Sequence, residues 1–223
     1  MELRPIARVH SDFGSKFGVP RQSGLVPELT AELEFEPEFR SPEAVRGLEA
    51  FSHIWLIWQF DRNGDRPWSP TVRPPRLGGN ERMGVFATRS PYRPNPIGLS
   101  CVALEGVEMT AEGPVLRIAG ADLVDGTPIL DIKPYLPYCD SHPEATSGWT
   151  EGLAHHPLAV EIRPELAEML ANDLPGLTDV LAGDPRPRYQ HDPNREYGLT
   201  YGKWNVTFRV EDGVAVVLCV EQR

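Results

Sequence analysis

Apolar and polar residues alternate in short segments along much of this chain, a period typical of β-strands. The clearest case is Leu29 to Phe35 (LTAELEF), in which every second position is apolar. Phe51 to Phe60 (FSHIWLIWQF) is aromatic and β-branched, which predicts a central strand. So many strands separated by turn signals predict a mainly β fold, either an antiparallel sheet or a single antiparallel β-barrel. The other expected strands lie at residues 3–9, 83–88, 97–108, 114–120 and 128–133.

Two segments between these strands have a different character. Ser41 is a good N-cap and Pro42 suits the first helical position, which predicts a short helix after the second strand. Residues 62–82 are rich in Arg, Pro and Gly, so we expect a long mobile loop there.

A change of composition near residue 140 predicts a second domain. Residues 142–157 have little periodicity and resemble a linker, which leaves a barrel domain at residues 1–141 and a small α+β C-terminal domain at residues 158–223. Asp212-Gly213 is a strong hairpin signal near the end of the chain. In this domain we expect a helix over residues 163–172, closed by Asp-Leu-Pro-Gly, and strands over 203–210 and 214–221.

Composition and charge narrow the class of protein. The chain has 223 residues, 40% of them hydrophobic, and no apolar run long enough to span a membrane. The start, Met-Glu-Leu-Arg-Pro, does not resemble a signal peptide. Its three cysteines lack metal-ligand spacing and fit a reducing cytoplasm, so we predict no metal site. The net charge of −10 argues against general nucleic-acid affinity, although five arginines cluster between residues 73 and 93.

Residues 89–98, RSPYRPNPIG, form the most informative stretch. Three prolines restrict the backbone and predict a stiff extended loop, which would hold Arg89, Arg93 and Asn95 in set positions. Such a loop between two strands suits an anionic or nucleotide-like ligand. The alternative interpretation is a proline-rich surface turn with solvated arginines.

A second cluster spans Asp122 to Pro137. Asp125-Gly-Thr-Pro128 predicts a turn, and Asp131 and Lys133 share one face of the strand that follows, at two-residue spacing. An acid and a base held together could bind hydroxyl groups or position a proton acceptor. The alternative is an ordinary salt bridge at the end of a strand.

Weaker candidates lie elsewhere. Gln22 and Ser23 could bind a ligand from the loop between the first two strands, or simply form a turn. His53 in the aromatic strand suits a hydrogen-bonded core residue as well as a ligand contact. The charged and aromatic run Asp192 to Tyr197 suits either RNA contact or domain docking. No nucleophile elbow or P-loop is present in the sequence.

Four motifs in order make the chain resemble a known family: PRQSGLVPE at 20–28, GLEAFSHIWLIWQFDRN at 47–63, GVFATRSPYRPNPIGLS at 84–100 and DGTPILDIKPYLPYCDS at 125–141. Together they resemble the TrmO family, also called YaeB-like or TsaA-like. The resemblance implies a non-Rossmann methyltransferase, with one β-barrel that carries S-adenosylmethionine. It also implies methyl transfer to N6 of threonylcarbamoyladenosine next to the anticodon of tRNA, by a homodimer.

The resemblance also suggests roles for residues. Asp125 or Asp131 could face the sulfonium of the cofactor, and Arg89 or Arg93 could clamp the threonyl carboxylate. Asn95 and Ser90 could bind adenine edges or ribose. Our catalytic set is Asp125, Asp131, Lys133 and Tyr135. Our cofactor set is Gln22, His53, Arg89, Ser90, Arg93, Asn95, Leu123, Asp125 and Thr127.

Three hypotheses and two further expectations follow. The chain could methylate tRNA, methylate a small molecule, or bind an adenosine ligand without catalysis. For RNA contact we expect Arg73, Arg76 and Arg82, with Arg188 and Arg195 as the alternative. For the homodimer we expect Trp55 and Trp58 to supply apolar surface, unless both lie inside the barrel.

Overall fold

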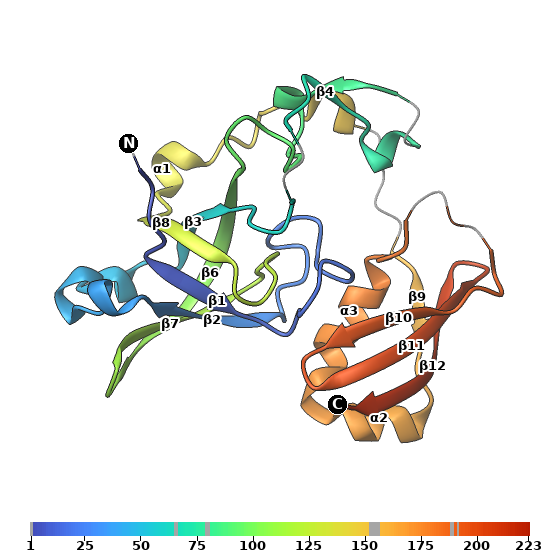
Figure 1. Cartoon of the computed structure of the whole chain (residues 1–223). Helices are drawn as coiled ribbons and strands as arrows, with labels where there is room; N and C mark the ends of the chain where they lie inside the picture. Colours follow the sequence, from blue (N-terminus) through green and yellow to red (C-terminus); the bar gives the residue numbers. More distant parts are fainter. Residues whose placement is uncertain (1, 65–66, 79–80, 152–156, 188–189, 191) are drawn as a thin grey trace.

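Six antiparallel strands close into a barrel in this computed structural model, which describes residues 2–64, 67–78, 81–151, 157–187, 190 and 192–223 (Figure 1). The strand order around the barrel is β1-β2-β7-β6-β3-β8, and β8 pairs with β1 to close it. The prediction of a mainly β fold with an antiparallel barrel is confirmed. The strands are β1 (Ala7–His10), β2 (Thr30–Phe35), β3 (His53–Gln59), β6 (Ile97–Thr110), β7 (Gly113–Ala119) and β8 (Pro128–Pro134).

Alternation of side chains fills the barrel. In β2 every second residue is buried, as the sequence pattern predicts, and β3 buries Ile54, Leu56 and Trp58 in the same way. These residues pack against Leu116 and Ile118 of β7 in one hydrophobic cluster. The outward positions of the same strands, such as Trp55, are only half-buried.

The short helix expected after the second strand is present as a 3₁₀ helix (Pro42–Val45), with Ser41 at its N-cap position, although the Ser41 side chain makes no capping hydrogen bond. One strand prediction is wrong. The strand expected over residues 83–88 is only β5 (Met83–Gly84), which pairs with β4 (Thr71–Val72), and a 3₁₀ turn (Val85–Ala87) follows. The Val85 carbonyl accepts hydrogen bonds from the Thr88 side chain and from Arg93, so loop contacts replace a strand partner there.

The C-terminal part is a four-stranded sheet with helices. Its order is β10-β11-β12-β9, and β9 runs parallel to β12. The prediction that Asp-Leu-Pro-Gly closes a single helix is wrong, because Leu174-Pro-Gly begins a second helix with proline in its first turn. The elements are β9 (Ala159–Glu161), α2 (Pro164–Leu170), α3 (Leu174–Ala182), β10 (Tyr197–Tyr201), β11 (Trp204–Glu211) and β12 (Val214–Gln222).

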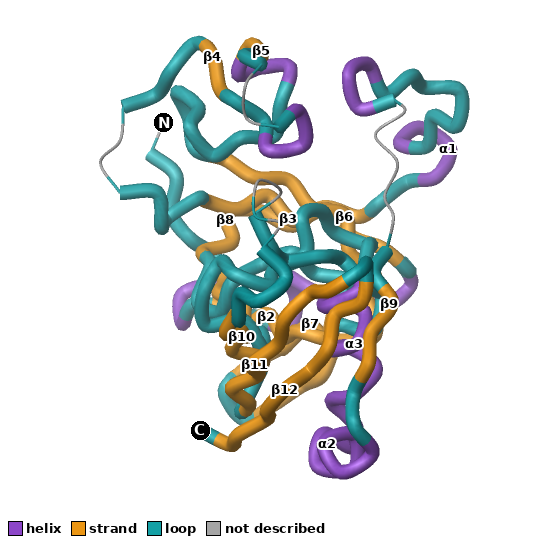
Figure 2. Tube along the Cα trace, turned by 90° about the vertical axis from the view of Figure 1, so that its right-hand side faces the viewer, coloured by secondary structure: helices purple, strands orange, loops and turns teal. Residues whose placement is uncertain are grey.

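The connection between β1 and β2 joins the barrel to this C-terminal part. Phe13, Val26 and Leu29 belong to the hydrophobic cluster of the C-terminal sheet and helices. The Gly202 N–H donates to the Asp12 carbonyl at 2.7 Å. Figure 2 shows the C-terminal strands beside this end of the barrel. Apolar contacts therefore hold the two parts together although a long connection separates them.

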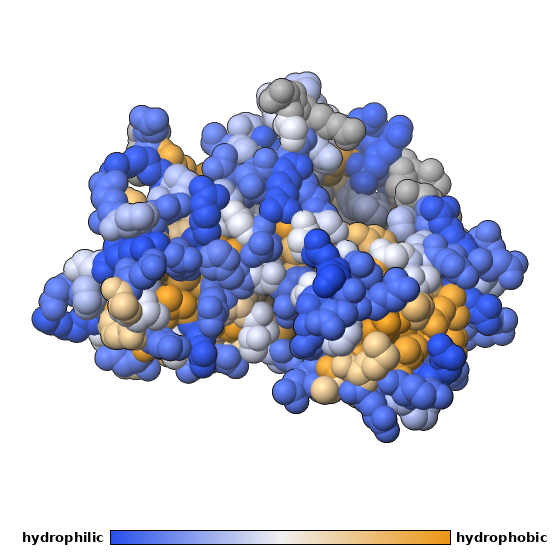
Figure 3. Space-filling model, turned by 60° about the horizontal axis from the view of Figure 1, so that its bottom comes forward, coloured by the Kyte–Doolittle hydropathy of each residue, from blue (hydrophilic) through white to orange (hydrophobic). Residues whose placement is uncertain are grey.

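The two parts of the molecule differ in the hydropathy of their surfaces. The face turned forward in Figure 3 is mainly hydrophilic, with hydrophobic side chains gathered over the C-terminal part. In the part of the chain that the structure describes, no helix has both the length and the apolar character needed to cross a membrane.

Candidate functional site

Three connections meet at one end of the barrel. Antiparallel strands place alternate connections at the same end, so β1–β2, β3–β6 and β7–β8 are linked there. Residues from all three connections line a cavity of about 480 Å³, which we call the barrel-end cavity. Long-range topology therefore brings together the loop near residue 20, the proline-rich loop and the segment near residue 122.

Aromatic rings form one wall of the barrel-end cavity. The rings of Trp58 and Phe60 lie 4.2 Å apart between centroids, at 60°. Gly98 faces the Trp58 indole so closely that an added Cβ would lie 2.2 Å from it. Only glycine fits at this position without moving the indole.

A carboxylate lies inside the barrel-end cavity. Asp122 Oδ1 accepts a hydrogen bond from Ser100 Oγ at 2.6 Å, and Ser100 Oγ accepts one from the Trp58 indole at 3.0 Å. Burial raises the pKa of Asp122, while the bonds from Ser100 and from the Ser23 backbone and the charge of Arg89 oppose that rise. A positive charge placed beside Asp122 therefore favours the ionised form of this carboxyl group.

Asp122 is not among the site residues that we predicted from the sequence. The sequence does contain a feature that points to it, because Asp122 is the one charged residue of the apolar run Ile118 to Val124. Such a carboxylate in a run of this kind is either partnered or functional.

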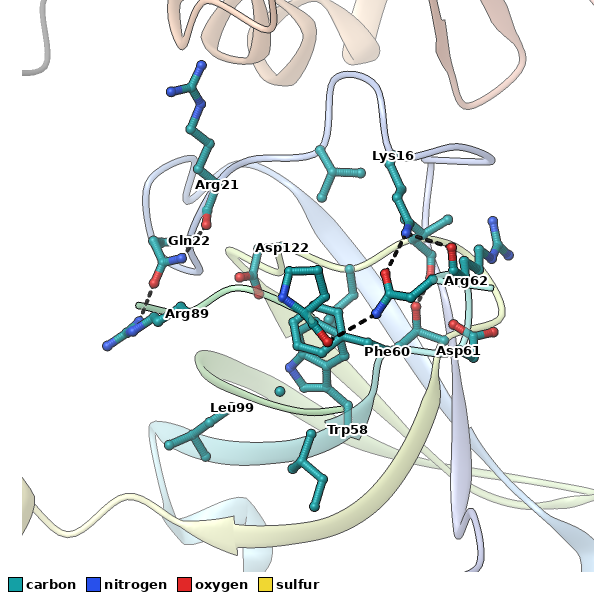
Figure 4. A pocket seen from close by; sticks show the side chains of 18 of the residues that line it. Lys16, Arg21, Gln22, Trp58, Phe60, Asp61, Arg62, Arg89, Leu99 and Asp122 are labelled. Atoms are coloured by element: carbon teal, nitrogen blue, oxygen red, sulfur yellow. Dashed lines mark hydrogen bonds between the residues drawn. The ribbon is translucent and has the colours of Figure 1, made fainter. Parts of the chain in front are cut away.

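Basic side chains at the rim of this cavity donate hydrogen bonds to neighbouring loops (Figure 4). Lys16 donates to the Arg62 carbonyl at 2.8 Å, and Arg62 donates to the Gly14 carbonyl at 3.0 Å. Arg89 donates to the side chain of Gln22, on the other side of Asp122 in this view. These contacts tie the loops together at the rim of the cavity.

Five residues of the predicted cofactor set line the barrel-end cavity, but not all present a free polar group. Arg93 donates to the carbonyls of Val85 (3.2 Å) and Thr88 (2.7 Å), so it stiffens its own loop. Thr127 Oγ1 is buried and donates to the Val124 carbonyl at 2.6 Å. The five are Gln22, Arg89, Arg93, Leu123 and Thr127.

Three other predicted residues lie near this cavity but outside it. Ser90 lines a neighbouring cavity, and Asn95 is exposed, with its carbonyl accepting from the Ile97 N–H at 2.8 Å. Asp125 lies 3.6 Å from His10 and accepts from the Ser11 N–H at 3.3 Å, in a different surface hollow. Asp122, three residues before Asp125, lines the barrel-end cavity.

The remaining predicted residues do not join the barrel-end cavity. Asp131 and Lys133 form an ion pair of 2.9 Å on the outside of β8, which agrees with the interpretation of this pair as an ordinary salt bridge. His53 and Tyr135 lie 6.2 Å apart between ring centroids. At about 3.3 Å per residue, the five steps of β3 from Trp58 to His53 span ~16 Å. The fold therefore brings the start of the second cluster to the first one in the barrel-end cavity, while strand direction and side-chain alternation place Asp131, Lys133 and Tyr135 away from that cavity.

A second cavity of about 910 Å³ adjoins the first, and we call it the arginine cavity. Arg73 and Arg82, two predicted RNA contacts, line it together with Trp149 and Arg186. The other predicted contacts include Arg195, whose guanidinium lies 5.6 Å from the Tyr197 ring centroid. The Arg76 side chain and Arg188 lie outside the described residues.

No group of three or more His, Cys, Asp or Glu side chains within the described ranges could hold a metal ion. The three cysteines among them are free, with Cys139 and Cys219 exposed.

Comparison with known proteins identifies the family. Residues 8–141 match the model of the tRNA-methyltransferase O N-terminal domain, and residues 155–223 match that of the TrmO C-terminal domain. The chain is 44% identical to the Escherichia coli tRNA (adenine(37)-N6)-methyltransferase, over 100% of this chain and 98% of that protein. It is 42% identical to a putative S-adenosylmethionine-dependent methyltransferase of Pseudomonas aeruginosa, over 88% and 87% of the two chains.

A solved structure agrees with these sequence matches. The crystal structure of TrmO from Pseudomonas aeruginosa superposes with a TM-score of 0.79 and 36% identity, over 99% of this chain and 98% of that one. The resemblance inferred from the four sequence motifs is therefore confirmed, and with its barrel, its cavity and both family domains the chain belongs to the TrmO family.

Proposed function

We propose that this protein transfers a methyl group from S-adenosylmethionine to N6 of adenine 37 in tRNA, where that adenine carries a threonylcarbamoyl group. The observation that carries the proposal is the barrel-end cavity with Asp122 inside it. The relative from Escherichia coli is named for this reaction at adenine 37, and the two chains align over nearly their whole length.

The residues of the barrel-end cavity fit the cofactor. Its volume of about 480 Å³ lies within the usual range for small-molecule sites. The Trp58 and Phe60 rings suit the adenine, Arg89 suits the carboxylate of the methionine part, and Asp122 suits a cation. The bound cofactor supplies an electrophilic methyl group on a sulfonium, and its transfer to nitrogen breaks the C–S bond and releases one proton from N6.

Asp122 has two tasks in this proposal. Its negative charge stabilises the positive donor, and the carboxylate is placed to accept the proton that leaves N6. Ser100 and the Trp58 indole hold the carboxylate in place through their hydrogen bonds of 2.6 Å and 3.0 Å. The hydrogen bonds that Lys16 and Arg62 donate to backbone carbonyls hold the surrounding loops in place, which favours alignment of the methyl donor and the acceptor.

Transfer of labelled methyl groups to tRNA tests this function. We expect the wild-type protein to label tRNA that carries threonylcarbamoyladenosine and not tRNA that lacks it. Asp122→Asn should lower the rate by about a hundredfold, as for loss of a general base. Calorimetry adds a matched comparison, because Asp122→Asn should remove preference for the cationic cofactor over neutral S-adenosylhomocysteine. Labelling of small-molecule adenosine derivatives but no tRNA would contradict the proposal.

We also propose a homodimer that acts in the cytoplasm, where its tRNA substrate is found. Trp58 is 9% exposed inside the barrel and cannot supply apolar contact surface. Ile97 and Leu99 are better candidates, because they line the barrel-end cavity and remain 39% and 55% exposed. A second copy would cover them, and light scattering that shows only a monomer of roughly 25 kDa at micromolar concentration would contradict this.

For the domains we keep residues 1–141 as the barrel, 142–157 as the linker and 158–223 as the C-terminal domain. The ranges matched by the two family models, 8–141 and 155–223, support this division.

A further inference from the structure

The arginine cavity has an unusual charge for a protein of net charge −10. Five arginines line it, and among the described residues no aspartate or glutamate does. Asp184 neutralises one of the five through contacts of 2.8 Å and 3.0 Å to Arg186. Among the described residues of this lining, basic side chains therefore outnumber acidic ones, which favours an anionic ligand.

Two of these arginines flank the β4–β5 hairpin. Thr71 pairs with Gly84 and Val72 with Met83, and Arg73 and Arg82 are the next residues beyond the last pair. Both line the same cavity, so their like charges repel each other. Arg82 donates to the Thr71 hydroxyl at 2.7 Å, while no hydrogen bond or ion pair of Arg73 is found among the described residues. An anion between the two guanidinium groups would remove this repulsion.

The arginine cavity adjoins the barrel-end cavity. The two share Arg21, Thr88, Arg89 and Pro91 in their linings. A ligand whose reacting atom lies at the barrel-end cavity can therefore place an attached group in the arginine cavity. The acceptor of the proposed reaction has this form, because its threonyl carboxylate is attached through a carbamoyl group to N6 itself.

Arg89 and Arg93, which the sequence suggested as ligands of the threonyl carboxylate, already donate hydrogen bonds to other groups. Arg93 donates to two backbone carbonyls of its own loop. Arg89 donates to Gln22 through one guanidinium nitrogen, and the proposed function assigns its other donors to the carboxylate of the cofactor. A carboxylate clamp needs a guanidinium fork with unused donors, and Arg73 meets that condition best.

We propose that Arg73 and Arg82 bind the threonyl carboxylate of the acceptor nucleotide and so determine specificity for modified tRNA. This inference rests on the proposed function. Trp149 lines the same cavity, and its indole N–H donates to the Ala87 carbonyl at 2.7 Å, which holds the ring where a nucleotide base can stack.

Binding of two RNA probes tests this role without any methyl transfer. One is an anticodon stem-loop with threonylcarbamoyladenosine, and the other carries a neutral carboxamide in place of the carboxylate. Fluorescence anisotropy with S-adenosylhomocysteine present gives both affinities. The wild-type protein should bind the acid about ten- to a hundredfold more tightly than the amide, as for charge-assisted hydrogen bonds. In Arg73→Gln and Arg82→Gln that ratio should fall to within about threefold of one.

Matched variants separate this role from general electrostatics. Arg46→Gln removes the same charge from an exposed site outside the cavity and should keep the wild-type ratio. Arg73→Lys keeps the charge without the fork and should give an intermediate ratio. If Arg73→Gln weakens both probes equally, the guanidinium contacts RNA phosphate and the assignment is wrong. A wild-type ratio in both glutamine variants would also overturn it.

The outcome is separable from that of the proposed function. A wild-type protein that methylates neither RNA refutes the proposed reaction, while the binding ratio still tests the clamp. Normal methyl transfer by Arg73→Gln with unchanged preference for the acid refutes the clamp alone.

Discussion

The buried link from Trp58 through Ser100 to Asp122 predicts that Ser100→Ala weakens both the fold and the cofactor site. Ser100 is 1% exposed and has two partners, the indole N–H at 3.0 Å and the carboxylate at 2.6 Å. Alanine removes the acceptor of one and the donor of the other, with no change in volume beyond one oxygen atom.

The magnitude follows from these two losses. A hydrogen bond to a charged group contributes about 1.5–3 kcal/mol, and an unpaired buried N–H costs about 1–3 kcal/mol. The cavity beside Asp122 admits water, which can replace part of what the carboxylate loses. We therefore expect the free energy of unfolding to fall by about 2–3 kcal/mol at neutral pH.

The pH dependence has a definite sign. Burial raises the pKa of Asp122, and the bond from Ser100 lowers it, so Ser100→Ala raises this pKa further. A group whose pKa is raised on folding stabilises the fold below its unfolded pKa, and that contribution is lost as pH rises through the folded pKa. The difference between variant and wild type should thus be smallest below about pH 4 and grow toward neutral pH.

Urea unfolding and calorimetry with S-adenosylmethionine measure these effects between pH 4 and 8. The pH at which cofactor affinity is half-maximal should rise in Ser100→Ala, because the hydrogen bond that lowers the pKa of Asp122 is lost. Ser41→Ala is the control, because Ser41 is exposed and makes no capping bond. Unfolding within about 0.5 kcal/mol of wild type, together with an unchanged pH profile, would refute the reasoning.

Three further outcomes are expected. Gly98→Ala should displace the Trp58 indole and lower cofactor affinity by at least about tenfold, measured by calorimetry; unchanged affinity and tryptophan fluorescence would show that the ring can move freely. Treatment with a chelator should leave cofactor binding unchanged, and lost binding that a metal restores would contradict this. With about three to five phosphates neutralised, the logarithm of tRNA affinity should fall against log salt with a slope of roughly −2 to −5, and a flat dependence would exclude electrostatic recognition.

Sequence alone determined the six strands of the barrel and the family. The alternation in Leu29 to Phe35 and the aromatic run of β3 follow from a period of two, which local residue order records directly. Helix boundaries after residue 163 were less predictable, because Leu174-Pro-Gly can end one helix or begin the next, and packing against the C-terminal sheet selected the second option. The sequence also placed Gln22 and Arg89 in the same predicted set, and in the structure their side chains are hydrogen-bonded in the lining of one cavity.

Only the tertiary structure decided which residues of each motif meet. Asp131 and Lys133 point outward from β8, while Asp122, in the connection before that strand, lies inside the barrel-end cavity. That choice depends on strand direction, on side-chain alternation and on closure of the barrel, which are set by pairings between residues far apart in the chain. For the same reason only the folded chain places Arg73 and Arg82 in one cavity with Trp149, which no local pattern records.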